Sequence, residues 1–275
     1  MNSVAEPDPL SGAISAATAL PDKYDGLKPE LGKGSLIAWD DFPDVTYHKL
    51  EMLARVQYKA GVALLRDRDL TYAAEVHVRG LLEFLGHVTY VTGYDSEEAV
   101  GSARRRALCV EVGMAKGEFN LLHHRLSERS IPQPDAARAQ AKEALEALRE
   151  LHHDEGCGCR GRDDGSTEPM LKRLAANGGA PFDTLLSLYS SSSLFIHQAF
   201  FRRLLEEVAP GVSDYVPATN KHRASLLSWL VMPYELAISE ILRTDSAEAS
   251  DQFHQEALDI FRLPVYQAAL RGELD

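Results

Sequence analysis

The chain has 275 residues, 45% of them hydrophobic, which is enough to bury a full core in one domain. Its formal net charge of -12 argues against a general affinity for nucleic acid, because phosphate binding depends on clustered Lys and Arg. Three cysteines make no disulfide framework and fit a reducing compartment. The longest apolar run, residues 226–238, contains Pro233 and Glu235 and is shorter than the roughly 20 residues that span a bilayer. We therefore expect a cytoplasmic protein without a membrane span.

Residues 1–44 predict a flexible N-terminal arm. They show no sustained periodicity and are rich in small, polar and proline residues; the prolines are Pro7, Pro9, Pro21, Pro29 and Pro43. The small apolar run over residues 13–20 lacks the basic segment of a secretion signal. Within this arm we expect order only where Leu36, Ile37 and Trp39 dock.

Residues 45–275 predict a single all-helical domain. Apolar residues at intervals of three and four predict a helix over 46–68 and a second over 70–92. The second is apolar on several sides, which is typical of a central helix. Gly93 predicts its end, and the acidic residues that follow predict the start of a third helix over about 95–130.

The second half of the chain continues the helical pattern. Helices are predicted over 135–153, from Pro169, over 181–208, over 219–243 with a kink at Pro233, and over 247–261. Residues 154–168 are rich in glycine and charge and predict an exposed loop. Because no run alternates like a strand pair, the predicted fold class is all-α. We expect an irregular bundle of about seven to eight helices with a poorly ordered N-terminal arm.

Polar residues interrupt two of the apolar helices at intervals of four. Arg79 and Glu83 share one helical face within ion-pairing distance, and Tyr189, Ser193 and His197 form a ridge along the 181–208 helix. Burying such groups costs several kcal/mol (~2–7 for an unpaired polar group) unless they satisfy one another. The two sets therefore predict a polar central groove lined by all five side chains.

This groove admits several interpretations. It suits a binding or regulatory protein in which Tyr189 and Ser193 contact the ligand. It also suits a hydrolase or a toxin- or defence-type nuclease in which His197 is the general acid or base, Arg79 holds an anion, and Glu83 completes the buried cluster. A structural partner that packs against a second copy is a third reading. The architectural alternative, with a surface ion pair and a satisfied core imidazole, stays open.

The order Arg-x-x-x-Glu, long charged helix, Tyr-x-x-x-Ser-x-x-x-His resembles the bacterial all-helical family of unknown function numbered 5677. The resemblance covers about residues 50–208, through Arg79, Gly80, Leu82, Glu83, Tyr189, Ser193 and His197. It implies a helical bundle and an intracellular bacterial protein, sometimes discussed near nuclease-like helical toxins and defence proteins, with no established activity. The Arg–His spacing of those toxin nucleases is absent from this sequence, which argues against ribonuclease activity.

One short segment offers metal ligands. The candidates are His152, His153, Cys157 and Cys159. Structural zinc sites take Cys pairs two to four residues apart plus a distant second pair, so this spacing predicts weak, adventitious affinity and no dedicated metal site. The glycines within 156–161 spell G-x-G-x-x-G, but a helix precedes them where a dinucleotide site needs a strand, so we expect no cofactor.

The remaining polar clusters are assigned to solvent. Residues 221–223 (Lys-His-Arg), His123 and His124 are expected as solvated positions, and residues 104–106, the basic triplet, as partly exposed charge with one internal salt bridge. The expected partners are a small molecule or a protein, including a second copy of the chain in a homodimer. Neither a membrane nor nucleic acid is expected.

Overall fold

The computed structural model describes residues 8–28, 42–93, 103–125, 134–154, 172, 184–187, 189–190 and 218–274. Within these residues the chain is helical and contains no strand, which confirms the predicted all-α class. The elements are α1 (Ser11–Leu27), α2 (Asp44–Leu64), the 3-10 turn η1 (Thr71–Ala73), α3 (Ala74–Thr92), α4 (Ala103–Arg125), α5 (Pro134–Asp154), α9 (Asn220–Asp245), α10 (Ala247–Arg262) and α11 (Pro264–Leu270).

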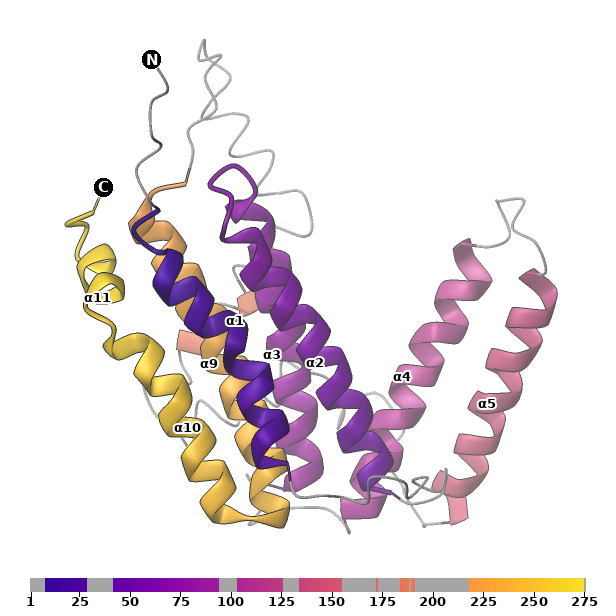
Figure 1. Ribbon diagram of the computed structural model, residues 1–275. Helices are drawn as coiled ribbons and strands as arrows, with labels where there is room; N and C mark the ends of the chain where they lie inside the picture. Colours follow the sequence, from indigo (N-terminus) through magenta and orange to yellow (C-terminus); the bar gives the residue numbers. More distant parts are fainter. Residues whose placement is uncertain are drawn as a thin grey trace.

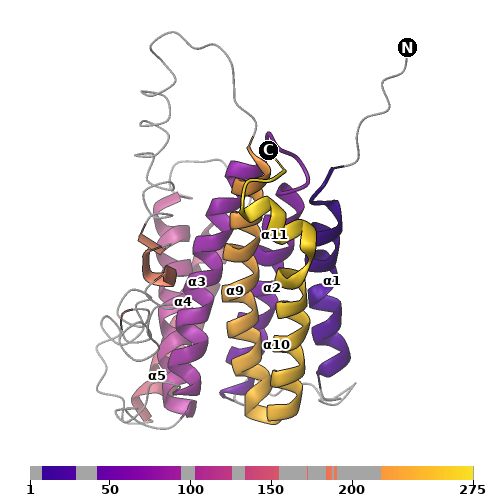
Figure 2. The same cartoon turned by 90° about the vertical axis from the view of Figure 1, so that its left-hand side faces the viewer.

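Helix α9 is the central helix of the bundle. It contacts α1, α2, α3, α10 and α11, and the long helices run side by side (Figures 1 and 2). Its inward side chains are fully buried; they include Leu226, Leu227, Leu230, Val231 and Tyr234. By length and composition α9 is apolar enough to cross a membrane, but most of that stretch is buried inside the bundle. A core helix of this length passes the same test, so its apolarity is explained by its central position.

Helix α1 corrects the prediction of a flexible arm for residues 11–27. Together with the preceding Leu10, one side of it packs in the core between α2 and α10 through Ala13, Ile14, Ala17, Leu20 and Tyr24. Pro21 lies inside the helix and has no N–H to donate to the carbonyl of Ala17, four residues earlier. The buried Tyr58 hydroxyl of α2 donates to that carbonyl at 2.9 Å. A tertiary hydrogen bond thus replaces the missing helical one.

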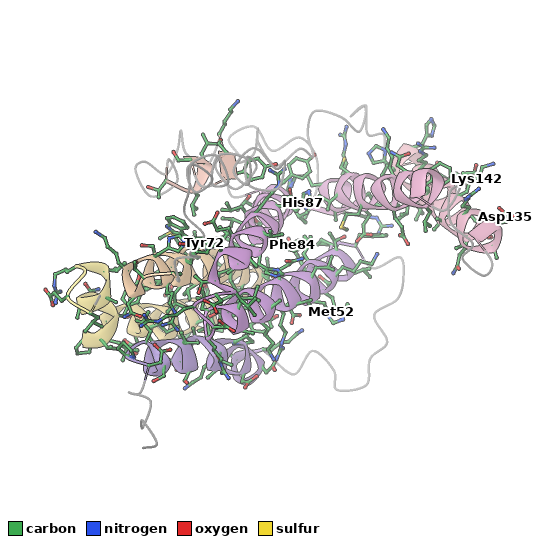
Figure 3. All side chains as sticks on the ribbon, turned by 90° about the horizontal axis from the view of Figure 1, so that it is seen from above. Met52, Tyr72, Phe84, His87, Asp135 and Lys142 are labelled. Carbon is green, nitrogen blue, oxygen red and sulfur yellow. The ribbon has the colours of Figure 1, made fainter. Side chains whose placement is uncertain are left out.

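Helices α4 and α5 form an antiparallel hairpin beside the bundle. Figure 3 shows Asp135 and Lys142 of α5 far from the bundle helices. The first half of α4 makes the junction: the Nε of Arg106 donates to the carbonyl of Val91 at 3.0 Å, near the C-terminal end of α3. Arg106 is buried, so within the basic triplet it is the internal charge. It satisfies one of the carbonyls that a helix end leaves without a partner.

Candidate functional site

Polar residues follow one face of α3 at intervals of four. They are Glu75, Arg79, Glu83 and His87, and all four are half-buried. Since each residue turns the helix by about 100°, the four form a slowly drifting row, which we call the α3 polar stripe. Figure 3 shows Tyr72 and His87 on the side of α3 away from Met52 of α2. Glu75 and His87 were missed in the sequence, although the interval of four extends to both.

Arg79 lies at the centre of the stripe. Its Nε donates to Oε1 of Glu83 at 3.1 Å, and its Nη2 donates to the Tyr189 hydroxyl at 3.3 Å. The guanidinium carbon also lies 4.7 Å from the centroid of the Tyr189 ring, which is cation–π geometry. The Arg79 side chain is 19% exposed and that of Glu83 40%, so this pair is neither a surface pair nor a fully buried one.

The third nitrogen of Arg79 differs from the other two, which have acceptors. Its Nη1 is buried and has no hydrogen-bond partner. A charged donor left without an acceptor is unfavourable by roughly 1–3 kcal/mol or more. The structure thus brings Arg79, Glu83 and Tyr189 together around one unpaired guanidinium donor. Ser193 and His197, the other two residues of the predicted groove, lie outside the described residues.

Arg223 corrects its assignment to solvent. Its side chain is 1% exposed, and its guanidinium makes five hydrogen bonds. Two reach the carboxylate of Asp8, two the carbonyl of Leu65 and one the side-chain oxygen of Asn220. A guanidinium carries five N–H groups, so this arginine is saturated by the protein itself. Arg223 is therefore a structural residue, whereas Arg79 retains an unpaired donor.

Glu75, one turn before Arg79, faces His222 in the first turn of α9. The Glu75 Oε1 and His222 Nε2 atoms are 3.7 Å apart, with the side chains 16% and 29% exposed. Burial raises the pKa of Glu75 to about 7 and lowers the pKa of His222 below its ordinary value. The Tyr72 ring lies 5.0 Å from the imidazole, centroid to centroid. His222 is therefore part of the stripe's surroundings, which corrects its assignment to solvent.

The two candidate metal ligands at the end of α5, His152 and His153, lie in different surroundings. The Nε2 of His152 lies 3.2 Å from the Sγ of Cys109 on α4, whereas the side chain of His153 is 92% exposed. Burial, and secondarily the charge of Arg105, lower the pKa of His152. Cys157 and Cys159 lie outside the described residues. Among the residues that the structure describes, no group of three His, Cys, Asp or Glu side chains is placed to hold a metal ion.

The fold and the stripe define the chain as an all-α helical bundle with a polar row on a central helix. Comparison with protein-family models, with curated proteins and with solved structures finds no match. The resemblance to the family numbered 5677 therefore rests on the motif residues alone.

Proposed function

We propose that this chain is a helical-bundle binding or regulatory protein, and that Arg79 anchors an anionic group of its ligand. The observation that carries the proposal is the buried, unpaired Nη1 of Arg79. Guanidinium N–H groups pair strongly with carboxylate and phosphate oxygens. A ligand oxygen at this position would supply the acceptor that the described residues lack.

The neighbours of Arg79 support binding of a small ligand. Glu83 and Tyr189 each accept a hydrogen bond from Arg79, so its side chain loses little further freedom when a ligand arrives. The carboxylate of Glu83 lies beside the anchor and would repel a second negative charge. A ligand with one anionic group therefore fits better than a polyanion such as nucleic acid. The cytoplasmic and bacterial assignments stay expectations from cysteine content and the family resemblance.

Thermal unfolding with and without inorganic phosphate or acetate tests this proposal. We expect these anions to stabilise the wild-type chain and to have a smaller effect on Arg79→Gln. Arg55→Gln is the matched control, because Arg55 is 23% exposed and ion-paired with Asp25 but lies on α2. An equal response of wild type and Arg79→Gln to the anions would contradict the proposal.

An enzyme remains the alternative from a different class. The same anchor would hold a scissile ester or phosphate for a hydrolase or a toxin- or defence-type nuclease, with His197 as general acid or base. His197→Ala separates the cases: loss of turnover at unchanged thermal stability favours the enzyme, and loss of stability favours a structural network.

A structural homo-oligomer is favoured by a separate observation on α2. Met52, Leu53 and Val56 are large apolar side chains that are 48%, 43% and 65% exposed. Clustered exposed apolar side chains are typical of protein–protein contacts. Light scattering of the wild-type chain and of Val56→Glu tests this candidate, which requires a dimer that the substitution dissociates.

A further inference from the structure

The pair of Glu75 and His222 has an unusual arrangement. The distance of 3.7 Å between Oε1 and Nε2 exceeds hydrogen-bond length. The Nε2 of His222 is nevertheless buried without a hydrogen-bond partner. Glu75 makes no hydrogen bond through its carboxylate within the described part of the chain. Two strong metal-ligand atoms thus face each other across a short gap without pairing.

Two other histidine–carboxylate pairs in the described residues are explained by their own contacts. The Nδ1 of His254 lies 2.8 Å from Oε1 of Glu235, which is hydrogen-bond distance. His48 lies 3.7 Å from Glu51, but Lys28 already pairs with that carboxylate at 2.7 Å and His48 is 47% exposed. The pair of Glu75 and His222 differs because both side chains are largely buried while Nε2 of His222 has no hydrogen-bond partner.

The separation of the two atoms is close to that of two ligands of one metal ion. Zinc binds imidazole nitrogen at about 2.0–2.1 Å and carboxylate oxygen at about 2.0–2.2 Å. At the tetrahedral angle of about 109°, two such bonds place their donor atoms roughly 3.3–3.5 Å apart, so the observed 3.7 Å requires only a small inward shift of the two side chains. We propose that Glu75 and His222 are two protein ligands of a site for a divalent transition metal, with Zn²⁺ as the ion whose preferred donors and bond lengths they fit.

Both ligands are held by rigid backbone. Glu75 lies in the first turn of α3 and His222 in the first turn of α9, and these helices pack against each other. The backbone N–H of His222 is capped by the Thr219 hydroxyl at 3.1 Å, and the Tyr72 ring, tilted by 33°, lies against the imidazole. A metal ion would therefore meet ligands that are already oriented.

The site would be open. No third His, Cys, Asp or Glu joins the pair in the portion of the chain described by the structure, so water or an exogenous donor takes the remaining positions. Open positions are typical of metal sites that bind or activate a ligand, whereas closed four-ligand sites are structural. The contacts of Arg79 with Glu83 and Tyr189 involve neither of these two ligands.

Isothermal titration of the chelator-treated full chain with Zn²⁺ tests the site, and Co²⁺ absorption reports its ligands. We expect one Zn²⁺ per chain and an affinity at least about ten-fold lower in Glu75→Gln and in His222→Ala. Two controls should bind like wild type: Glu83→Gln, from the same stripe, and His254→Ala, from a pair that is already hydrogen-bonded.

Circular dichroism establishes which variants are folded. If His222→Ala does not fold, then His222→Gln, which retains a polar side chain, takes its place beside Glu75→Gln. The proposal is overturned if the wild-type chain binds no Zn²⁺. It is also overturned if folded variants at both positions bind Zn²⁺ as tightly as wild type, because the ion then binds to other histidines or cysteines.

Discussion

Arg223 of α9 donates two hydrogen bonds of 2.7 Å to the two carboxylate oxygens of Asp8, 215 residues earlier in the chain. The same guanidinium contacts the carbonyl of Leu65 at the end of α2, and Asn220 continues the cluster to the carbonyl of Leu274. Four distant parts of the chain therefore meet at one buried charge.

Loss of this arginine should strongly destabilise the protein. Arg223→Ala leaves the Asp8 carboxylate and the Leu65 carbonyl without their donors, and we expect the free energy of unfolding to fall by roughly 3–5 kcal/mol. Urea denaturation followed by circular dichroism measures the change. Arg262→Ala is the control, because Arg262 is 64% exposed and should change stability by no more than about 0.5 kcal/mol. Similar stabilities of the two variants would refute the structural role of Arg223.

The same pair predicts a dependence on pH. The hydrogen bonds from Arg223 hold the pKa of Asp8 below its ordinary value. A carboxyl group whose pKa is lower in the folded state stabilises the fold above its unfolded pKa of about 3.9 and loses that contribution as the pH falls further. The stability difference between wild type and Asp8→Asn should therefore be present at pH 7 and shrink below about pH 4. Denaturation at several pH values checks this, and a difference that grows in acid would contradict it.

Two helical glycines should respond oppositely to alanine. A Cβ on Gly61 would lie 2.6 Å from Cδ2 of Leu230, a fully buried side chain, and 3.1 Å from Cβ of His77. Gly61→Ala should therefore be destabilising, by about 1–3 kcal/mol. A Cβ on Gly113 of α4 meets nothing within 4 Å, so Gly113→Ala should stabilise by about 0.5–1 kcal/mol through helix propensity. Thermal unfolding of both variants measures these changes in stability. A stabilising Gly61→Ala would show that α2 and α9 pack less tightly than the 2.6 Å distance implies.

The Tyr58 hydroxyl should contribute more to folding stability when residue 21 is proline than when it is alanine. Tyr58→Phe leaves the carbonyl of Ala17 unpaired, which should cost about 1–3 kcal/mol. Pro21→Ala provides an N–H that can complete the helical bond to the same carbonyl. In a double-mutant cycle, Tyr58→Phe should therefore cost less in the Pro21→Ala background. Equal losses of stability in the two backgrounds would show that the Tyr58 hydroxyl does not compensate for Pro21.

Tyr189 should act on Arg79 through both its ring and its hydroxyl. Tyr189→Phe keeps the ring that lies 4.7 Å from the guanidinium and removes the hydroxyl that accepts at 3.3 Å. Tyr189→Leu removes both. If Arg79 is the anion anchor, phosphate stabilisation should decrease in the order wild type, Tyr189→Phe, Tyr189→Leu, since each step loosens the arginine. The thermal shift at fixed phosphate concentration measures this order, and three equal shifts would exclude a role for Tyr189.

Local patterns in the sequence were sufficient for most described helices. The predicted helix over 135–153 corresponds to Pro134–Asp154, and that over 247–261 to Ala247–Arg262. Each has its signals within a few residues: apolar residues at helical spacing, and at Ser246 a cap whose hydroxyl accepts from the N–H of Ala249. Helix α1 escaped prediction because small alanines carry little periodic signal and Pro21 suggested a break. The Tyr58 hydroxyl of α2 supplies the carbonyl of Ala17 with the hydrogen bond that Pro21 cannot make. This contact comes from outside the local sequence of α1.

The sequence by itself determined the all-α class, the ends of α5, α9 and α10 to within two residues, and the shared face of Arg79 and Glu83, because these depend on neighbours within one or two helical turns. Only the tertiary structure decided which polar groups are buried and what they face. Lys221, His222 and Arg223 are consecutive, yet His222 faces Glu75 and Arg223 is saturated by Asp8, Leu65 and Asn220. The free-energy cost of burying a charge depends on its partners, and these lie on other helices. Local periodicity in the sequence does not show which helices will supply them.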